Sequence, residues 1–307
     1  MKTTWFERAI FFSWYCAKGD CTFCYMSTQK GKADKLARRK KESILAEAII
    51  CKNLGWKVEF LSGGYESYSI NELVDITKQI YLITGQKQWL NIGTLSKKEL
   101  IKFKPYIDGV CGAVECVNPA LHDDLCPSKP ISSIIKMFKD CDSLGLKKAM
   151  TIIIGLGETS EDIPLLIDFI KKNQISRITF YALNPHKGTI FTKGPSTKDY
   201  VKWISVVRDE FPDLFIIAGS WVDRLQEISS LLDAGADAIT KFPSIKLFGS
   251  KFAKQIEDNA KLAGREFVGS LTKLPLVDWD KELSNIDENL RNKVKIKLNQ
   301  YLAKMRS

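Results

Sequence analysis

The sequence predicts an α/β protein built as a TIM-type (β/α)8 barrel with a C-terminal helical extension. Two observations carry this prediction. Short apolar runs alternate along the chain with segments of helical periodicity, which is the order of elements in such a barrel. The chain has 307 residues, and a single barrel of this type commonly needs about 250.

Each predicted strand is a short run in which apolar residues dominate, and the branched run 151–154 suits a strand buried on both faces. The predicted strands span residues 9–15, 57–62, 88–93, 109–117, 148–154, 177–182, 214–218 and 236–240. Gly55, Gly145 and Gly235 stand where a helix would turn into the next strand.

Helical periodicity fills the segments between these runs. The predicted helices span residues 40–54, 70–83, 97–103, 131–144, 160–172, 197–210, 222–233 and 250–263. We assign residues 1–263 to the barrel and residues 264–307 to an extension packed on it, with helical periodicity over 286–302. A half-barrel followed by a separate domain is the alternative.

The composition is that of an ordinary globular protein, with 45% hydrophobic and 27% charged residues. No apolar run reaches the roughly 18 residues of a membrane-spanning helix, so no membrane association is expected. Glu7 and Arg8 interrupt any signal-peptide pattern, and we expect a cytoplasmic protein. Eight cysteines in such a chain favour metal ligation over disulfides.

The net charge is +10, and residues 30–41 hold a dense run of lysine and arginine. This run has two interpretations, a surface for an acidic partner such as a carrier protein, or a solvated helix start. The chain shows no interleaving of aromatic and basic residues and no recognised nucleic-acid module, so nucleic acid is not expected as the substrate.

Three cysteines near the N-terminus are the strongest functional signal. Cys16, Cys21 and Cys24 lie within nine residues, in a loop that follows the first predicted strand. Three thiolates can hold three corners of a cubic iron–sulfur cluster and leave the fourth iron open for chemistry. A structural zinc site needs four closed ligands, and the two histidines, His122 and His186, are distant in sequence. Three free or zinc-bound thiols are the alternative.

This loop resembles the cluster-binding loop of the radical S-adenosylmethionine (SAM) superfamily. That family usually places three and then two residues between its cysteines, with an aromatic residue before the last, a position that Phe23 fills. The first gap here holds four residues, 17–20, which indicates a side branch. The resemblance implies a [4Fe–4S] cluster on Cys16, Cys21 and Cys24, with SAM bound at the open iron.

Further motifs resemble SAM-binding elements of the same family. After the second predicted strand, Gly63 and Gly64 match the glycine pair that holds the methionyl amine, and Glu66 follows an inserted Tyr65. A simple turn is the alternative for the glycine pair. Glu115 lies in an apolar strand, where a lone carboxylate is costly, and is a candidate ligand of the SAM amine or ribose. A buried ion pair with a lysine is the alternative there.

The fifth predicted strand ends in Ile153, Gly155 and Glu158, which match an Ile-x-Gly-x-x-Glu element beside the adenine. A plain turn with a capping glutamate is the alternative. Asn184 follows the sixth strand and Lys241 the eighth. Their loops resemble the biotin-synthase-like branch, which includes hydrogenase maturase and methylornithine synthase. Each of the two side chains either faces the substrate or stabilises its own loop.

Cys111, Cys116 and Cys126 form a second group around the end of the fourth predicted strand. Sulfur-inserting members of the family use a second cluster as the sulfur donor, so this group is a candidate ligand set for a second iron–sulfur cluster. The alternative is three small buried hydrophobic residues. The odd separation of Cys111 and Cys116 points them to opposite faces of a strand, which weakens the cluster interpretation.

The resemblance, which covers roughly residues 9–250, implies a radical enzyme. In that family the reduced cluster cleaves SAM, and the resulting 5′-deoxyadenosyl radical removes hydrogen from an unactivated carbon. The leading hypothesis is sulfur insertion into an octanoyl chain, as in the two-protein type of lipoyl synthase. The partners then expected are an acidic acyl-carrier protein, a second radical SAM protein and an electron donor such as ferredoxin or flavodoxin.

Two other functions are consistent with the sequence. One is a carbon-skeleton or cofactor-maturation reaction, like those of methylornithine synthase or hydrogenase maturase. The other, of a different class, is a non-catalytic iron–sulfur or zinc-binding protein. Iron content separates the two enzymatic hypotheses, since about eight irons per chain indicate sulfur insertion and about four indicate the alternative.

Overall fold

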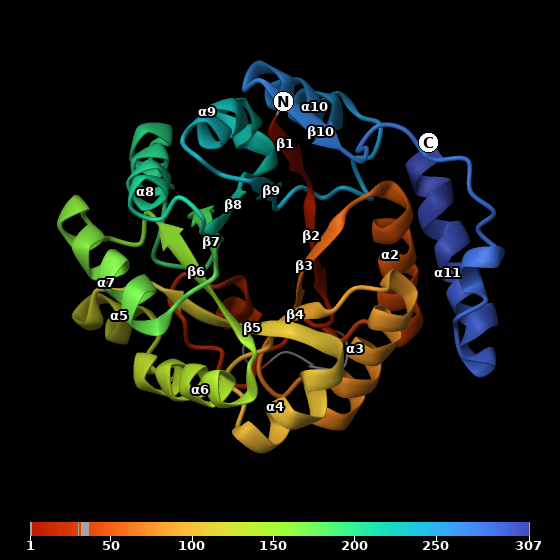
Figure 1. The fold of residues 1–307 in the computed structure, drawn as a ribbon, viewed down its shortest axis with the longest axis horizontal. Helices are drawn as coiled ribbons and strands as arrows, with labels where there is room; N and C mark the ends of the chain where they lie inside the picture. Colours follow the sequence, from red (N-terminus) through yellow and green to blue (C-terminus); the bar gives the residue numbers. More distant parts are fainter. Residues whose placement is uncertain (1, 30, 32–36, 307) are drawn as a thin grey trace.

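The chain folds around one parallel sheet of eight strands that curls into a barrel. A computed structural model describes residues 2–29, 31 and 37–306. In sheet order the strands are β2 (Glu7–Phe11), β3 (Lys57–Ser62), β4 (Gln88–Asn91), β5 (Ile107–Glu115), β6 (Lys147–Ile154), β7 (Arg177–Ala182), β8 (Phe215–Gly219) and β9 (Ala238–Thr240). Neighbouring strands are parallel, and the predicted fold class is confirmed (Figure 1).

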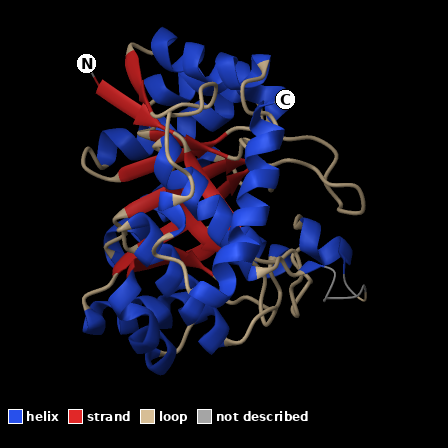
Figure 2. Ribbon diagram, turned by 90° about the vertical axis from the view of Figure 1, so that its right-hand side faces the viewer, coloured by secondary structure: helices blue, strands red, loops and turns tan. Residues whose placement is uncertain are grey.

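Helices follow the strands and enclose them, as Figure 2 shows. They are α2 (Lys41–Leu54), α3 (Ile70–Thr84), α4 (Lys97–Phe103), α5 (Pro119–Leu125), α6 (Ile131–Leu144), α7 (Ile163–Asn173), α8 (Thr197–Glu210), α9 (Ile228–Asp233) and α10 (Lys251–Leu262). Short 3-10 helices are η1 (Tyr25–Gln29), η2 (Lys104–Tyr106), η3 (Ser160–Asp162), η4 (Val222–Glu227) and η5 (Lys281–Leu283). Ser69 and Ser96 start α3 and α4 with capping boxes, which explains why those helix starts could be predicted. Helix α5 was not predicted.

The first barrel strand begins earlier than the sequence predicts. Glu7 opens β2 and is buried, because the Arg177 guanidinium on β7 lies 2.5 Å from its carboxylate. Beyond Phe11 the chain leaves the sheet, since the Trp14 N–H donates to the Ala37 carbonyl at 3.1 Å. The predicted strand 9–15 therefore covers only the end of β2. An ion pair between residues 170 positions apart leaves no local signal in the sequence.

The barrel closes between β9 and β2, and we call this junction the β9–β2 seam. Among the described residues, a lone parallel bridge between Phe6 and Ile239 joins its two sides, just before β2 begins. Above this bridge the Arg8 guanidinium crosses the seam and donates to the Phe242 carbonyl at 3.2 Å. The seam is thus joined by backbone at its base and by side chains above.

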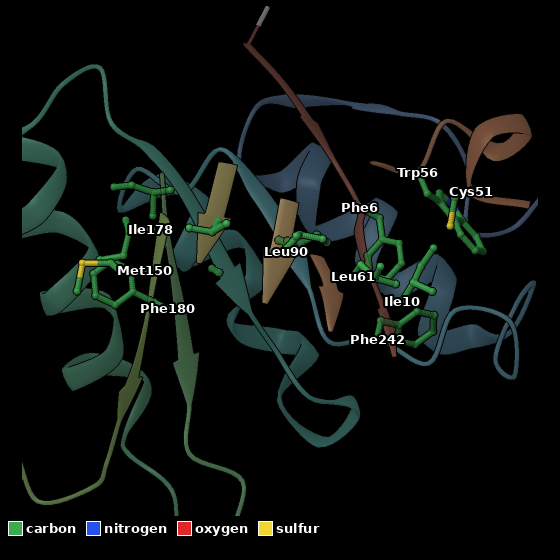
Figure 3. Packing of buried hydrophobic residues seen from close by; sticks show 14 of the residues in the cluster. Phe6, Ile10, Cys51, Trp56, Leu61, Leu90, Met150, Ile178, Phe180 and Phe242 are labelled. Atoms are coloured by element: carbon green, nitrogen blue, oxygen red, sulfur yellow. The ribbon is translucent and has the colours of Figure 1, made fainter. Parts of the chain in front are cut away.

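The core lies inside the barrel wall and beneath the helices. Figure 3 shows buried side chains from several strands, among them Leu61, Leu90, Met150, Ile178 and Phe180. Phe6 and Phe242 come from the two sides of the β9–β2 seam, and their rings meet edge-on with centroids 6.4 Å apart. This apolar contact stabilises the junction where the ladder is shortest.

The chain termini pack against the barrel. Strand β1 (Lys2–Trp5) pairs in parallel with β10 (Arg265–Val268), and neither of these four-residue strands was predicted. Helix α11 (Glu288–Arg306) packs on α2, where the Tyr301 hydroxyl lies 2.6 Å from the Ser43 hydroxyl. None of the described helices combines the length and the apolar character that a membrane crossing requires.

The basic run of residues 30–41 is described in part, because residues 30 and 32–36 lie outside the described residues. Of the remainder, Arg38 pairs with Glu72 at 3.0 Å and Lys41 pairs with Asp75. The Arg39 guanidinium lies 2.7 Å from the Glu47 carboxylate. These three basic side chains thus have acidic partners within the chain.

Candidate active site

A cavity of about 490 Å³ lies at the carboxyl ends of the barrel strands, and we call it the rim cavity. Every strand supplies a lining residue at or just beyond its end: Phe11, Ser62, Asn91, Glu115, Ile153, Tyr181, Trp221 and Lys241. In parallel barrels the loops at this end are the ones that carry chemistry. The cavity is therefore the place where residues from all eight strands can meet one ligand.

Residues 16–24, the cysteine loop, lie beside this cavity. The loop is held from two sides, since the Ala17 N–H donates to the Tyr65 carbonyl and the Thr22 N–H donates to the Leu125 carbonyl, each at 3.0 Å. Cys16, Cys21 and Cys24 are half-buried. Phe23 and Cys24 line the rim cavity itself, so the loop opens into it.

The surroundings of the cysteine loop are apolar. Phe23 is buried in a cluster with Cys116, Leu125, Cys126, Leu156 and Leu183, against which Cys21 and Cys24 pack. Burial raises the pKa of the Cys24 thiol to about 11. A hydrogen bond with Cys126 lowers the pKa of Cys21, against the opposing effect of burial. The loop thus places thiols of unequal acidity at the edge of a water-poor space.

Gly63 and Gly64, after β3, pack closely against the chain that leads into the cysteine loop. A Cβ atom on Gly64 would stand 2.1 Å from the Tyr15 carbonyl oxygen and 2.5 Å from the Cys16 Cβ. A Cβ on Gly63 would stand 2.4 Å from the Phe12 ring. Neither site has room for a side chain, so Gly63 lets the loop after β3 pack on Phe12, and Gly64 lets it pack on Tyr15 and on Cys16 of the cysteine loop.

Tyr65 and Glu66, which follow this glycine pair, do not line the rim cavity. Tyr65 covers Gly93, and its hydroxyl oxygen accepts a hydrogen bond from the Thr94 N–H at 3.1 Å. Glu66 is exposed, adopts a positive φ of 59°, and does not belong to the cavity lining. The structure therefore separates Glu66 from the predicted SAM-binding residues that line the cavity.

Glu115 faces the rim cavity from the end of β5, with a positive φ of 64°. The Thr151 hydroxyl donates to its carboxylate at 3.0 Å, and the buried Lys129 ammonium lies 3.5 Å away. Burial disfavours the charge on Lys129, but Glu115 and the nearby Cys126 and Cys21 more than offset this and raise the pKa of Lys129. The predicted lysine partner is present, and the carboxylate still lines the cavity.

The residues of the Ile-x-Gly-x-x-Glu motif at the end of β6 have different surroundings in the structure. Ile153 lines the cavity. The Glu158 carboxylate instead accepts hydrogen bonds from the N–H groups of Gly155 and Leu156, at 2.6 and 2.8 Å. Burial raises the pKa of Glu158. Both carboxylate oxygens of Glu158 thus bind their own turn, as the capping alternative expects, and hold it beside the cavity.

Asn184 lines the cavity from the loop after β7. His186 lines it two residues later and meets the Tyr25 ring with centroids 5.7 Å apart. Burial lowers the pKa of His186, which favours its neutral form. This contact brings the segment after the cysteine loop against the loop after β7, at the cavity mouth.

The three cysteines of the second group, Cys111, Cys116 and Cys126, do not lie together in the structure. Cys116 and Cys126 share the apolar cluster beside the cysteine loop, whereas Cys111 lies in a separate cluster with Phe60 and Ala149. Cys111 lies within β5, whereas Cys116 follows its end, just after Glu115 with its positive φ. The predicted ligand set of Cys111, Cys116 and Cys126 is therefore not brought together. Within the described part of the chain, no three His, Cys, Asp or Glu side chains are grouped to hold a single metal ion, and this holds for Cys16, Cys21 and Cys24 as well.

The sequence alone did not identify Arg8 and Arg39 as site residues, and it left two roles open for Lys241. Arg8 and Arg39 line it, and both bind the buried Glu47 carboxylate on α2, at 2.6 and 2.7 Å. Burial opposes the charge on Glu47, but the two arginines outweigh it and lower the pKa of this carboxyl. Lys241 also lines the cavity. The Arg8–Glu47–Arg39 group spans β2 and α2, and only the three-dimensional fold brings it together.

Comparisons with known proteins give matches over most of the chain. A model of the Radical SAM superfamily matches residues 12–170. An uncharacterized protein of Methanocaldococcus jannaschii is 41% identical over 99% of this chain and 90% of its own length. A biotin synthase of Methanococcus maripaludis is 25% identical over 64% of this chain and 63% of that protein.

Among solved structures, methylornithine synthase superposes with a TM-score of 0.73. The match has 18% sequence identity and covers 86% of this chain and 83% of that one. At this identity the likeness is one of fold. It supports the same barrel architecture that the strand order gives.

Proposed function

The chain belongs to the radical SAM superfamily and uses a [4Fe–4S] cluster and SAM, and we propose that it removes hydrogen from an unactivated carbon of a substrate held in the rim cavity. The observation that carries this proposal is the opening of the cysteine loop, through Phe23 and Cys24, into a cavity lined from all eight strands. When bound, the cluster supplies the electron that cleaves SAM and so generates the radical.

The donor set fits the cluster. We propose that Cys16, Cys21 and Cys24 ligate three irons, because these thiols share one loop and lie half-buried at the cavity edge. The absence of room at Gly64 fits the same assignment, since the loop after β3 holds Cys16 in place by direct backbone contact. The apolar cluster around Phe23 keeps water from the thiols and from the reactive end of the cavity.

The remaining predicted residues divide into two roles in this proposal. Glu115, Ile153 and Asn184 contact SAM, because they line the cavity on consecutive strands β5, β6 and β7. Gly155 and Glu158 position that wall through the hydrogen bonds of their turn. No SAM contact is proposed for the exposed Glu66.

For the reaction class we propose a carbon-skeleton or cofactor-maturation reaction. This choice is supported by the separation of Cys111 from Cys116 and Cys126, which removes the expected three-cysteine ligand set of a sulfur-donating cluster. Such a reaction needs the one cluster and a cavity of small-molecule size, and about 490 Å³ falls within the usual range of ligand sites.

Sulfur insertion into an octanoyl chain is the second candidate. It is favoured by the position of Cys116 and Cys126 beside the cysteine loop and by aromatic lining from Phe11, Phe60 and Trp221, which suits an acyl chain. This candidate brings with it an acidic acyl-carrier protein and a second radical SAM protein as partners. Both candidates require an electron donor of the ferredoxin or flavodoxin type.

Anaerobic reconstitution followed by reduction and addition of SAM tests the enzyme assignment. We expect 5′-deoxyadenosine from the wild type, none above background from Cys24→Ala, and wild-type amounts from Cys141→Ala, a buried cysteine on α6. Failure of the wild type to form the nucleoside contradicts the proposal. Iron content then separates the candidates, about four per chain for the first and about eight for sulfur insertion.

A further inference from the structure

We propose that Lys241 binds an acidic group of the substrate, so that the substrate of this chain is an anion whose charge lies at the β9–β2 seam. The inference rests on the proposed function and specifies its substrate class. Lys241 follows β9 directly and lines the rim cavity. In the ring of strands β9 lies across from β5, which carries Glu115.

Lys241 differs from the other cations of the cavity in having no acidic partner. Among the described residues, no ion pair or hydrogen bond involves its ammonium group. The group instead lies 4.4 Å from the centroid of the Tyr181 ring and 5.3 Å from that of Phe11. Arg8 and Arg39 share the Glu47 carboxylate, so each of them has an acidic partner, although the three groups together keep one net positive charge. Lys241 is therefore the cation of the cavity lining that has no acidic partner among the described residues.

Neither the buried Glu59, which binds the Tyr181 hydroxyl, nor Glu115 of the cavity lining is able to take that role. Glu59 is buried and does not belong to the cavity lining, and its two oxygens accept hydrogen bonds from Tyr181 and Thr240, each at 2.5 Å. Glu115 is bound by Lys129 and Thr151 on the far wall. A half-buried ammonium without a carboxylate gains most from an anion that arrives with a ligand.

The two aromatic rings fix where this anion sits. Tyr181 is held by its hydrogen bond to Glu59, and its ring supports the ammonium from one side. Phe11 lies at the end of β2, across the seam. An anion that meets Lys241 therefore enters from the cavity, and the apolar part of the same molecule can lie on these rings.

The backbone at Lys241 gives an independent indication. Its φ is +74°, a left-handed conformation that a lysine adopts at a cost. Of the four non-glycine residues with positive φ in the described chain, Glu66, Glu115 and Lys241 follow or end barrel strands at the rim. Strain of this kind persists at ligand-binding sites, where it aims a side chain that the function needs.

Lys241 also stands apart from the residues proposed for SAM. Those residues come from β5, β6 and β7 and their loops, whereas Lys241 comes from β9. Because β9 lies across the ring of strands from β5, we assign the anion at Lys241 to the substrate and not to SAM. The carboxylate of SAM is the competing anion, and the test below distinguishes the two.

The test measures binding of small probes to the anaerobic holoenzyme, with oxidised cluster and SAM, by ligand-observed NMR. The probes are 3-phenylpropionate, 2-phenylethylphosphonate and the neutral 3-phenylpropanamide. We expect wild type to bind at least one of the two anions about tenfold more tightly than the amide. Lys241→Met abolishes this preference and Lys241→Arg retains it. Lys246→Met, an exposed lysine outside the cavity lining, serves as the matched control and behaves as wild type.

SAM affinity is measured on the same variants. The proposal expects the SAM affinity of Lys241→Met to stay within about twofold of wild type. Equal binding of anions and amide by wild type overturns the inference, and so does an anion preference that survives in Lys241→Met. A loss of SAM affinity in Lys241→Met assigns the residue to SAM and also overturns it. If wild type forms no 5′-deoxyadenosine but shows the Lys241-dependent preference, the proposed function fails and this binding site stands.

Discussion

The two sides of the rim cavity are built in different ways. On the side of the cysteine loop, the backbone carbonyls of Tyr65, after β3, and Leu125 accept hydrogen bonds from the loop. Glu115 and Lys129 form an ion pair on the same side. On the side of the β9–β2 seam the ladder is short, and Arg8 crosses between the strands. Lys241 is left without an acidic partner there. The comparison indicates that the first wall is preorganised for a resident cofactor, whereas the second is completed by a ligand.

The largest effect on stability is expected at the seam, from Glu47→Gln. This change leaves Arg8 and Arg39 without their shared carboxylate, and breaking a buried ion pair costs about 3–5 kcal/mol. We expect the low end, because the two guanidinium groups keep carbonyl partners. Urea unfolding measures the loss, with Glu42→Gln on the same helix as the control. A loss below about 1 kcal/mol would contradict this account of the seam.

The Glu47 carboxylate should also make the free energy of unfolding fall at acid pH. The pKa of Glu47 lies below its ordinary value of 4.5, since the charged form is favoured in the folded state. Its stabilisation is therefore present above pH 4.5 and is lost as pH falls towards the lower folded pKa. Unfolding measured between neutral pH and acid should show this loss in wild type and a flatter dependence in Glu47→Gln.

The next effect is expected on the opposite wall, from Gly64→Ala. The new methyl group would overlap the Tyr15 carbonyl oxygen and the Cys16 side chain, so the cysteine loop must move. We expect a destabilisation of about 2 kcal/mol and a severalfold loss of iron after reconstitution. Gly85→Ala is the control for iron content, because its added methyl group meets nothing within 4 Å and the strain from its φ of +68° is confined to the end of α3. Equal iron content in both variants would show that the glycine does not support the loop.

Cluster incorporation should depend on pH through Cys24. Iron binds the thiolate, and burial raises the pKa of this thiol to about 11. Near neutral pH the thiol is protonated, so incorporation must release its proton, and affinity should rise with pH up to that value. The apparent affinity for the cluster, measured from pH 7 to 9, tests the sign of this dependence. An affinity that falls over this range would contradict it.

The smallest effect compares two strained residues. Asparagine tolerates positive φ better than lysine or glutamine, so Lys241→Asn and Gln174→Asn should each stabilise the fold by about 0.5–1 kcal/mol. Gln174 lies at the end of α7, away from the cavity. Thermal unfolding should show similar gains for both variants, whereas anion binding should be lost only in Lys241→Asn. Loss of anion binding in both would mean that the cavity responds to distant changes.

The sequence anticipated one wall better than the other, for a physical reason. Short sequence motifs identify the cysteine loop, Glu115, Ile153 and Asn184, because the residues of each motif lie close together in the chain. Most of these residues line the rim cavity. Arg8 was interpreted only as an interruption of a signal peptide, because its partner Glu47 lies 39 positions away. Glu66 does not line the cavity, and Cys111 lies in a different cluster from Cys116 and Cys126. The inserted Tyr65 and the odd spacing of Cys111 and Cys116 were the local signals that pointed this way.

The barrel itself was predictable because apolar runs, serine caps and turn glycines mark its elements one after another. The short strands β1 and β10 were missed because their partners lie at opposite ends of the chain. Helix α5 was missed because its seven residues are too few for a clear period. Local patterns thus gave the elements, and long-range pairs had to come from the structure.

The central claim is that the cysteine loop holds a cluster whose open iron is accessible to SAM from the rim cavity. Electron paramagnetic resonance of the reduced, anaerobically reconstituted protein, recorded with and without SAM, tests it directly. We predict the signal of a reduced [4Fe–4S] cluster that changes when SAM is added and is absent in Cys24→Ala. A protein that carries zinc in place of iron, or a cluster signal that SAM leaves unaltered, would contradict the claim.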